Sequence, residues 1–465
     1  MTKFALLLML VFEIPLAGSA AAQQPSREIQ LEVGFSKPLA VFQFVQSLSA
    51  RAQPNPLKTL FTSSEFNNAR YSALIAAFDS LPLDYEYEFP EYPAGQKIGG
   101  STLSILRRNF VITHDLDEFR NLSVGLIPLV DLVRLTSILR DFTPVYDKVV
   151  YEPARPVFER QLKTIDSLMV ARNIAQYFTQ AGQFYKSEYD PGIPFLFMFY
   201  PLPNARGFSA TAFGNVSMSA LPTSYTDFTV MLALMLHEAS HILFDEESLE
   251  FKKELDDWFN SNPSMYSRPA YGLLNEAWAT AVGNGYFYEK LTGHLIPGSW
   301  YGFKYNSDMA KAMYPFIKEY LDAGKPMDKA LVDKQVEMYE TKFPDWIYAW
   351  DNLMAGRTVI SDDSSDFDLI DRKFPYRHVQ TYLHDFSSES FEKLARGGTK
   401  FIIIHNDNRR KLDLVKSHFP VLAKWRPDSR KDFALAHVLP DKTQLIIVNL
   451  VKSTLEQQFN SRIEH

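Results

Sequence analysis

The spacing of apolar residues predicts that the first part of the chain after residue 22 is mostly helical. Apolar residues recur every three or four positions, as in amphipathic helices, over residues 39–49, 68–78 and 122–139. Residues 81–100 are rich in Pro, Gly and Tyr, which predicts a loop with short extended pieces. We therefore expect residues 23–152 to form a mostly helical N-terminal region.

The pattern changes near residue 153. Pro156 stands where a first-turn proline belongs, and the spacing beyond it predicts one helix over residues 157–185. Residues 193–200 form an apolar run typical of a buried strand, and residues 207–220 alternate like a second strand. Helix, strands and a further buried helix predict an α+β core, to which we assign residues 153–358.

The helix after these strands has a recognisable start. Pro222 breaks the chain, and Ser224 with Asp227 three residues later indicates a capping box for a helix over residues 225–244.

Residues 359–465 predict a small α/β unit. The Ser- and Asp-rich residues 361–368 indicate a linker or exposed loop. Two apolar strands, at residues 400–405 and 444–450, follow with a helix at residues 409–418. No glycine-rich phosphate-binding motif follows these strands. The expected fold class of the whole chain is α+β.

The N-terminus resembles a secretory signal peptide. Lys3 precedes nine apolar residues, and Ala20, Ala21 and Ala22 precede Gln23. A membrane-spanning helix needs about 20 residues, and we expect no later segment to be apolar for long enough. Residues 1–22 are therefore predicted to be removed near Ala22. The mature protein is predicted to be secreted or periplasmic, without stable membrane insertion.

The composition limits the kinds of partner and of metal site that are possible. Charged residues make up 22% of the chain, the net charge is −7 and no segment is strongly basic, so no nucleic-acid partner is expected. The sequence has no cysteine, which excludes disulfides, thiolate zinc sites and cysteine nucleophiles. Any metal must therefore be held by His and carboxylate ligands.

The central motif is His237-Glu238-Ala239-Ser240-His241. Residues four apart share one helix face, so both imidazoles can reach one metal ion, while Glu238 is rotated towards the reacting water as general base. Residues 231–244 hold no other charged or titratable residue, so this helix is predicted to be buried. The competing interpretation is a pair of core histidines bonded to backbone carbonyls.

The third ligand must come from elsewhere. Residues 273–290 predict a second apolar helix in which Glu276 is the only acid of the first four turns, and a cation is the natural partner for it. Glu276 could instead only complement the helix dipole. The rival third ligands are His294, Asp245, Glu246 and Glu247.

These motifs resemble the zincin metallopeptidases, in particular the gluzincin branch. The resemblance implies His237, His241 and Glu276 as zinc ligands, with Asn275 before the glutamate, and it covers about residues 155–350. The separation from His241 to Glu276 is longer than in the thermolysin-like and aminopeptidase-like groups, and it includes a charged helix, residues 246–259, expected to project into solvent. Thr280 replaces the acid that orients a histidine ligand in thermolysin-like enzymes. No GAMEN-like exopeptidase motif is present.

The resemblance also implies a substrate-binding edge strand and an oxyanion donor. Residues 207–220 lie where that strand belongs, although an ordinary sheet strand explains them equally well. The oxyanion donor is left open among four downstream residues: Tyr286, His294, Tyr301 and Tyr305.

The sequence therefore predicts an exported zinc-dependent peptidase with one Zn²⁺ per chain and peptide or protein substrates. Manganese and cobalt stay open as alternative ions. The alternative functions are an inactive zincin-like module that binds peptide or protein partners, and a structural surface protein in which the motif helix is only core.

Overall fold

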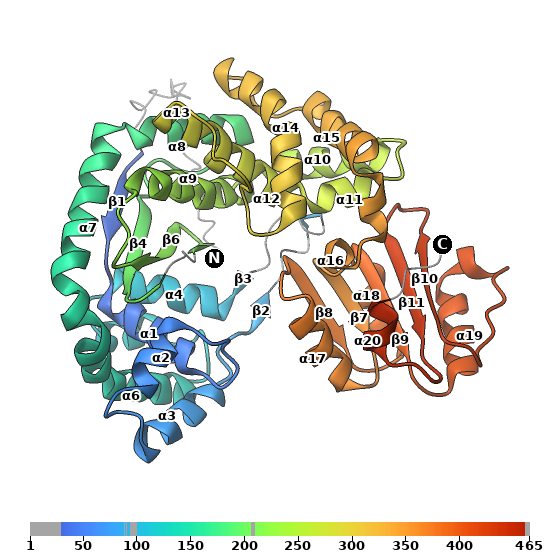
Figure 1. Cartoon of the computed structure of the whole chain (residues 1–465), viewed down its shortest axis with the longest axis horizontal. Coiled ribbons are helices and arrows are strands. Elements are labelled where there is room, and N and C mark those ends of the chain that lie inside the picture. Colours follow the sequence, from blue (N-terminus) through green and yellow to red (C-terminus); the bar gives the residue numbers. More distant parts are fainter. Residues whose placement is uncertain (1–28, 88, 90, 94–99, 206–209, 461–465) are drawn as a thin grey trace, which may run out of the picture.

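The computed structural model describes residues 29–87, 89, 91–93, 100–205 and 210–460. The predicted signal peptide, residues 1–22, lies outside the described residues. Figure 1 shows helices around one small sheet and a second sheet near the C-terminus. Helices combined with separate small sheets are consistent with the predicted α+β class.

The N-terminal helices bury a core of stacked phenylalanine rings, such as Phe110 on Phe119 at 3.6 Å between centroids. The helices predicted over residues 39–49 and 68–78 are confirmed. The helix predicted over residues 122–139 begins later, because Pro128 disfavours helical conformation in the residue before it. The elements are α1 (Lys37–Leu48), α2 (Pro56–Thr62), α3 (Ala69–Asp79), the β2 (Glu86–Tyr87) and β3 (Gly100–Ser101) pair, α4 (Thr102–Ile112), α5 (Leu116–Leu122) and α6 (Leu129–Tyr146).

A long helical stretch leads from this region towards the centre. Helix α6 continues through the π-helical η1 (Asp147–Tyr151) into α7 (Glu152–Ala171), so Pro156 lies inside a helix and its prediction as a first-turn residue is wrong. The single helix predicted over residues 157–185 is also wrong. Asn173 has φ of +52°, a left-handed conformation that separates α7 from α8 (Ile174–Tyr185). The predicted boundary between residues 152 and 153 falls within this stretch.

The central sheet has apolar cores on both faces. Its order is β1-β4-β6-β5, and β5 is antiparallel to β6 while the other pairs are parallel. Leu196 and Met198 face the N-terminal helices, and Phe197 and Phe199 face the helices that carry the motif. The strands are β1 (Leu31–Gly34), β4 (Phe195–Leu202), β5 (Ala210–Phe213) and β6 (Val216–Pro222).

The strand predicted over residues 193–200 is confirmed as β4, but the single strand predicted over residues 207–220 is wrong. Residues 207–209 lie outside the described residues. The remainder forms a hairpin of β5 and β6, because Gly214 takes φ of +55° at the turn. Of the two strands, β5 is the edge strand and β6 is internal.

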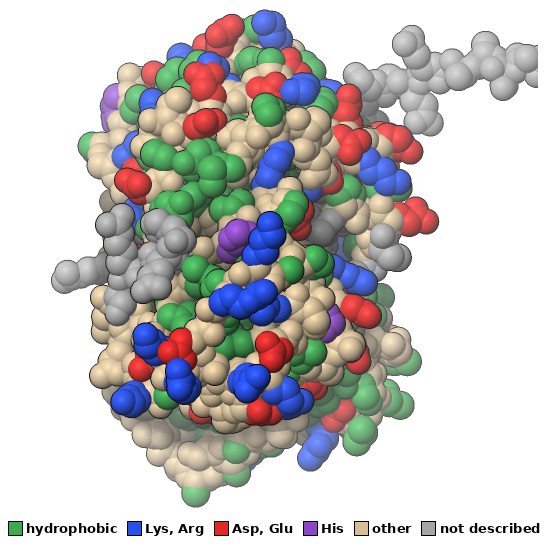
Figure 2. Space-filling model, turned by 90° about the vertical axis from the view of Figure 1, so that its right-hand side faces the viewer, with side chains coloured by type: hydrophobic (Ala, Val, Ile, Leu, Met, Phe, Trp, Pro, Cys, Tyr) green, Lys and Arg blue, Asp and Glu red, His purple; other side chains and the backbone are tan. Residues whose placement is uncertain are grey.

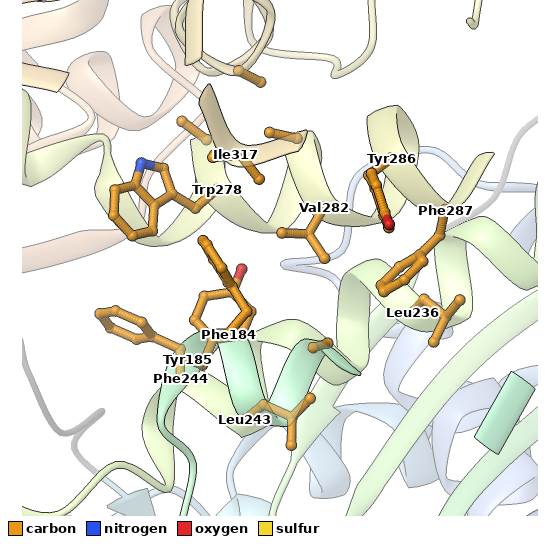
Figure 3. Close-up of a cluster of buried hydrophobic side chains, with 14 of the residues drawn as sticks. Phe184, Tyr185, Leu236, Leu243, Phe244, Trp278, Val282, Tyr286, Phe287 and Ile317 are labelled. Carbon is orange, nitrogen blue, oxygen red and sulfur yellow. The ribbon is translucent and has the colours of Figure 1, made fainter. Parts of the chain in front are cut away.

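The motif lies in helix α9 (Phe228–Asp245). Asp227 caps this helix by accepting from the Val230 amide, so the predicted capping box at Ser224 is wrong by three residues. The second predicted helix exists as α12 (Leu274–Thr280), π-helical η2 (Ala281–Phe287) and α13 (Tyr288–Thr292) in continuous succession. Helix α9 packs against α12, η2 and α8 through a large apolar cluster that includes Trp278 and Phe184 (Figure 3).

Most of the helices between residues 249 and 348 contribute buried residues to this cluster, and Figure 1 shows α10, α11, α14 and α15 close to α12. Helix α10 was expected to project into solvent, and this expectation is wrong: its apolar face, with Phe251, Leu255 and Phe259, is buried. The elements are α10 (Leu249–Ser261), α11 (Ser267–Gly272), α14 (Lys304–Asp322), α15 (Lys329–Lys342), the 3-10 helix η3 (Pro344–Tyr348) and α16 (Trp350–Leu353).

The C-terminal unit contains a five-stranded sheet of order β10-β11-β9-β7-β8, with helices packed against it. All neighbours are parallel except β10 and β11. The elements are β7 (Gly356–Ile360), α17 (Ser364–Lys373), β8 (Val379–Leu383), α18 (Ser388–Ala395), β9 (Thr399–Ile404), α19 (Asn408–His418), η4 (Pro420–Leu422), β10 (Phe433–Val438), β11 (Gln444–Asn449) and α20 (Leu455–Phe459).

The linker or exposed loop predicted over residues 361–368 is confirmed only in part: residues 362–365 are exposed, but helix α17 begins at Ser364. Ser361 and Asp366 are buried, and the Ser361 hydroxyl donates to Asp366 at 2.6 Å. Asp363 caps α17, which begins within this segment. The predicted boundary before residue 359 falls inside strand β7.

Two observations concern membranes and charged partners. Contrary to expectation, α9 is long and apolar enough to cross a membrane, the only such helix in the described part of the chain, but 61% of its apolar window is buried in the molecule. A core helix passes the same test. Figure 2 shows Lys and Arg gathered on the outer face of the C-terminal unit with acids among them; Arg410, for example, pairs with Asp407.

Candidate metal centre

The site depends on the close approach of η2 to α9. A Cβ atom at Gly283 would lie 2.6 Å from Cβ of His237 and 2.7 Å from its backbone nitrogen. Only glycine fits this position without moving one of the helices. The contact brings the helix that carries Glu276 against the helix that carries His237 and His241.

Three ligand atoms converge between these helices. Nε2 of His237 lies 3.1 Å from Oε1 of Glu276 and 3.2 Å from Nε2 of His241, and the third separation is 3.6 Å. Ligands about 2.1 Å from a tetrahedral ion are roughly 3.4 Å apart. The structure therefore brings together the three predicted ligands at separations that suit one small metal ion.

The environment of Glu276 also fits a cation. Its buried Oε1 accepts no hydrogen bond of good geometry from any residue that the structure describes. Burial acts to raise the pKa of Glu276, but His241 and His237 together hold it well below its usual range. The carboxylate is therefore charged and faces two imidazole nitrogens, the donor set that zinc binds in hydrolytic sites.

Asn275 orients one of the histidines. Nδ1 of His241 donates to Oδ1 of Asn275 at 2.7 Å, which directs Nε2 towards Glu276. Burial acts to lower the pKa of His241, but the charge of Glu276 and these hydrogen bonds raise it to about 9. The sequence motif included Asn275, but this contact was not predicted.

Glu238 is buried beside His237 and lies outside the group of ligand atoms. This position agrees with helix geometry, which turns it by one residue from the face shared by the histidines. Its charge contributes to the raised pKa of His241, so its carboxylate lies near the centre. Its role as general base stays a prediction.

The rival third ligands lie elsewhere. His294 is exposed, with its ring against Tyr288, and Glu247 is buried beside Lys252. Asp245 and Glu246 end helix α9 beyond the motif. Among the residues that the structure describes, Glu276 alone joins the histidines within ligand distance.

Thr280 does not replace the missing acid. Its Oγ1 is buried and makes no hydrogen bond within the described chain, and the same holds for Nδ1 of His237. Asn275 therefore supports His241 with a hydrogen bond, whereas none of the described residues hydrogen-bonds to Nδ1 of His237.

Tyr301 is the oxyanion candidate that the structure places at the centre. Its ring stacks on His237 at 5.8 Å between centroids, with 22° between the planes. The other candidates have different surroundings: Tyr286 donates to Asp322, and Tyr305 packs on Trp346. Burial and the charge of Glu276 raise the pKa of Tyr301, so its hydroxyl stays protonated and able to donate.

Sequence reasoning missed Tyr376, which lies between α17 and β8. Its pKa is raised by burial and by the charge of Glu276, a residue 100 positions earlier in the chain. No motif marks it, because only the packing of the C-terminal unit against the metal-site helices brings it here.

The chain was compared with protein-family models, curated proteins and solved structures. No family model, curated protein or solved structure matches it.

Proposed function

We propose that this chain is an exported zinc-dependent hydrolase, a peptidase of the gluzincin type, whose zinc is held by His237, His241 and Glu276. The observation that carries the proposal is the convergence of two Nε2 atoms and one Oε1 at separations suited to a single tetrahedral ion. Two histidines and a glutamate with an open fourth position favour zinc over manganese or cobalt. Export rests on the residue pattern of positions 1–22 alone.

The surrounding residues support hydrolysis of an amide. Bound zinc supplies a water of pKa about 7 and polarises the substrate carbonyl. Glu238 accepts a proton from the attacking water and passes it to the leaving nitrogen as the C–N bond breaks. Tyr301 donates a hydrogen bond to the carbonyl oxygen as negative charge develops. One water is consumed, and a carboxylate and a protonated amine are released.

An extended peptide is the substrate class that the sheet favours. Strand β5 is the edge of the central sheet and packs against α9, the helix that carries the histidines. The free edge of a strand can pair with a peptide backbone through its amides and carbonyls. A peptide paired with β5 would extend the sheet that packs against α9.

The test combines metal analysis with a peptide-library cleavage assay. We expect about one zinc per chain, and cleavage that stops with chelator and returns with zinc. Glu276→Ala should lose zinc, whereas His294→Ala, an exposed histidine outside the cluster, should keep it. A zinc-free wild-type chain, or cleavage that resists chelation, would overturn the proposal.

A further inference from the structure

A loop of the C-terminal unit reaches the metal centre. It connects α17 to β8, and it contains Tyr376. The ring of Tyr376 stacks on Phe303 at 4.0 Å between centroids and meets Tyr301 edge-on at 6.2 Å. Tyr301 in turn stacks on the ligand His237. The loop is therefore one residue removed from the metal ligands.

The hydroxyl groups in this contact are organised as well as the rings. Nδ2 of Asn306, a buried residue of α14, donates to the hydroxyl of Tyr376 at 2.6 Å. Tyr301 lies beside Tyr376 and near Glu276, and both neighbours add to the effect of burial in raising the pKa of Tyr301. Asn306, the two tyrosines and the carboxylate of Glu276 thus form one group of neighbouring polar side chains. Ring packing alone would not require the hydroxyl groups, because phenylalanine at either tyrosine position would fill the same space.

Both ends of the loop are fixed. The guanidinium of Arg357, fully buried in β7, donates to the carbonyl of Phe374 at 3.2 Å and to Asp371 at 2.5 Å. After Tyr376, the amide of His378 donates to the carbonyl of Ala355 at 2.9 Å. Tyr376 is therefore held in place by the framework of the C-terminal sheet.

The segment that contains Tyr301 is fixed too. The carbonyl of Trp300, next to Tyr301, accepts from Asn284 of η2 at 2.8 Å, and the carbonyl of Tyr301 accepts from Ser299 at 2.7 Å. Two anchored segments thus meet at the hydroxyl pair, an arrangement typical of groups that support metal ligands from outside.

We infer that the C-terminal unit completes the metal centre through Tyr376, a positioning residue that holds the hydroxyl of Tyr301 towards Glu276. The inference rests on the proposed metal site, and it assigns the C-terminal unit a role in that site. Removing the Tyr376 hydroxyl should loosen Glu276 although no ligand is touched. Outer partners of metal ligands typically contribute about 10- to 100-fold to metal affinity.

The experiment measures zinc affinity by competition with a chromophoric chelator, together with the visible spectrum of the cobalt-substituted chain. Tyr376→Phe keeps both ring contacts and should weaken zinc binding by about tenfold and shift the cobalt spectrum. The matched control is Tyr320→Phe, which removes a hydroxyl near the end of α14 that donates to Asp328, the N-cap of α15. The control should bind zinc like the wild type. Thermal unfolding shows whether each variant is folded.

A double-mutant cycle with Tyr301→Phe tests the route of the effect. If Tyr376 acts through Tyr301, Tyr376→Phe changes little in a chain that already contains Tyr301→Phe. An unchanged affinity and spectrum in Tyr376→Phe, or additive effects in the cycle, would overturn the inference. A wild-type chain that binds zinc but cleaves no peptide would overturn only the peptidase proposal. A wild-type chain that binds no zinc would overturn both.

Discussion

Asn275 accepts a hydrogen bond from Nδ1 of His241 across the contact between α12 and α9, at 2.7 Å. The bond selects the tautomer of His241 in which Nε2 is free to bind a metal. Because Asn275 precedes Glu276, one turn of α12 supplies both a proposed zinc ligand and the support of another proposed ligand.

Asn275→Ala should therefore weaken zinc binding by about 10- to 100-fold, because His241 loses the partner that fixes its tautomer and ring orientation. Chelator competition measures the effect. Asn262→Ala is the control, since it removes an amide that donates to Asp333 away from the site. Equal affinities of wild type and Asn275→Ala would show that the hydrogen bond does not orient a metal ligand.

The contact between Gly283 and His237 gives a second prediction. Gly283→Ala should destabilise the fold by about 1–3 kcal/mol or more, because the added methyl group meets backbone atoms that cannot move independently. Zinc affinity should fall as well, since the helices separate at His237. Denaturant unfolding and zinc competition measure the two effects.

Gly272→Ala is the matched control, because no described atom outside its chain neighbours and its own helix backbone lies within 4 Å of the Cβ position. Its stability should stay near that of the wild type. A Gly283→Ala variant as stable as Gly272→Ala would mean that the helices do not approach each other as closely as the structure shows.

The sequence was informative where function depends on local spacing. The four-residue interval places His237 and His241 on one helix face, and Glu276 stood out as a lone acid in an apolar segment. The apolar runs of β4 and β9 were likewise sufficient to predict strands, because strands buried on both faces are apolar throughout.

Predictions failed wholly or in part where side chains interact over long distances or the backbone takes an unusual conformation. Residues 361–368 look like a linker, but Ser361 and His405 both bond to Asp366, so the polar groups are satisfied inside the fold. The break at Asn173 depends on a left-handed conformation that the apolar spacing does not reveal. Tyr376 reaches the metal centre only through the packing of separate units.

The buried Glu247, which lies beside Lys252, predicts how the stability of the fold depends on pH. Glu247 and Lys252 lie 3.5 Å apart with both side chains fully buried. Burial raises the pKa of Glu247 to about 8, although Lys252 acts to lower it. In an unfolded chain this pKa is about 4.3. Between these values the folded state holds a proton that the unfolded state has released, so stability should fall as pH rises.

Glu247→Gln should remove this contribution, because the amide does not titrate. Urea unfolding between about pH 5 and 8 should show a smaller loss of stability with rising pH in Glu247→Gln than in wild type. Glu250→Gln changes an exposed glutamate in the first turn of α10 and should keep the wild-type slope. The same slope in all three proteins would rule out Glu247 as the source.

A substitution at Glu238 distinguishes a catalyst from a binding module. It lies beside the ligand His237 but outside the group of atoms that could hold the metal. Glu238→Gln keeps the size and polarity of the side chain and removes the proton acceptor. The variant should fold and bind zinc like the wild type, while hydrolysis falls by several orders of magnitude, because metal, base and water act as one unit.

The measurements are zinc content, zinc affinity and single-peptide turnover for wild type and Glu238→Gln. Glu250→Gln again provides a neutral substitution of an exposed glutamate, and it should retain full activity. Loss of zinc from Glu238→Gln would make Glu238 a ligand or a support of one, contrary to its assigned role. Zinc-loaded wild type without turnover on a broad peptide library would favour the inactive zincin-like module that binds peptide or protein partners, and it would leave the base Glu238 without a catalytic use.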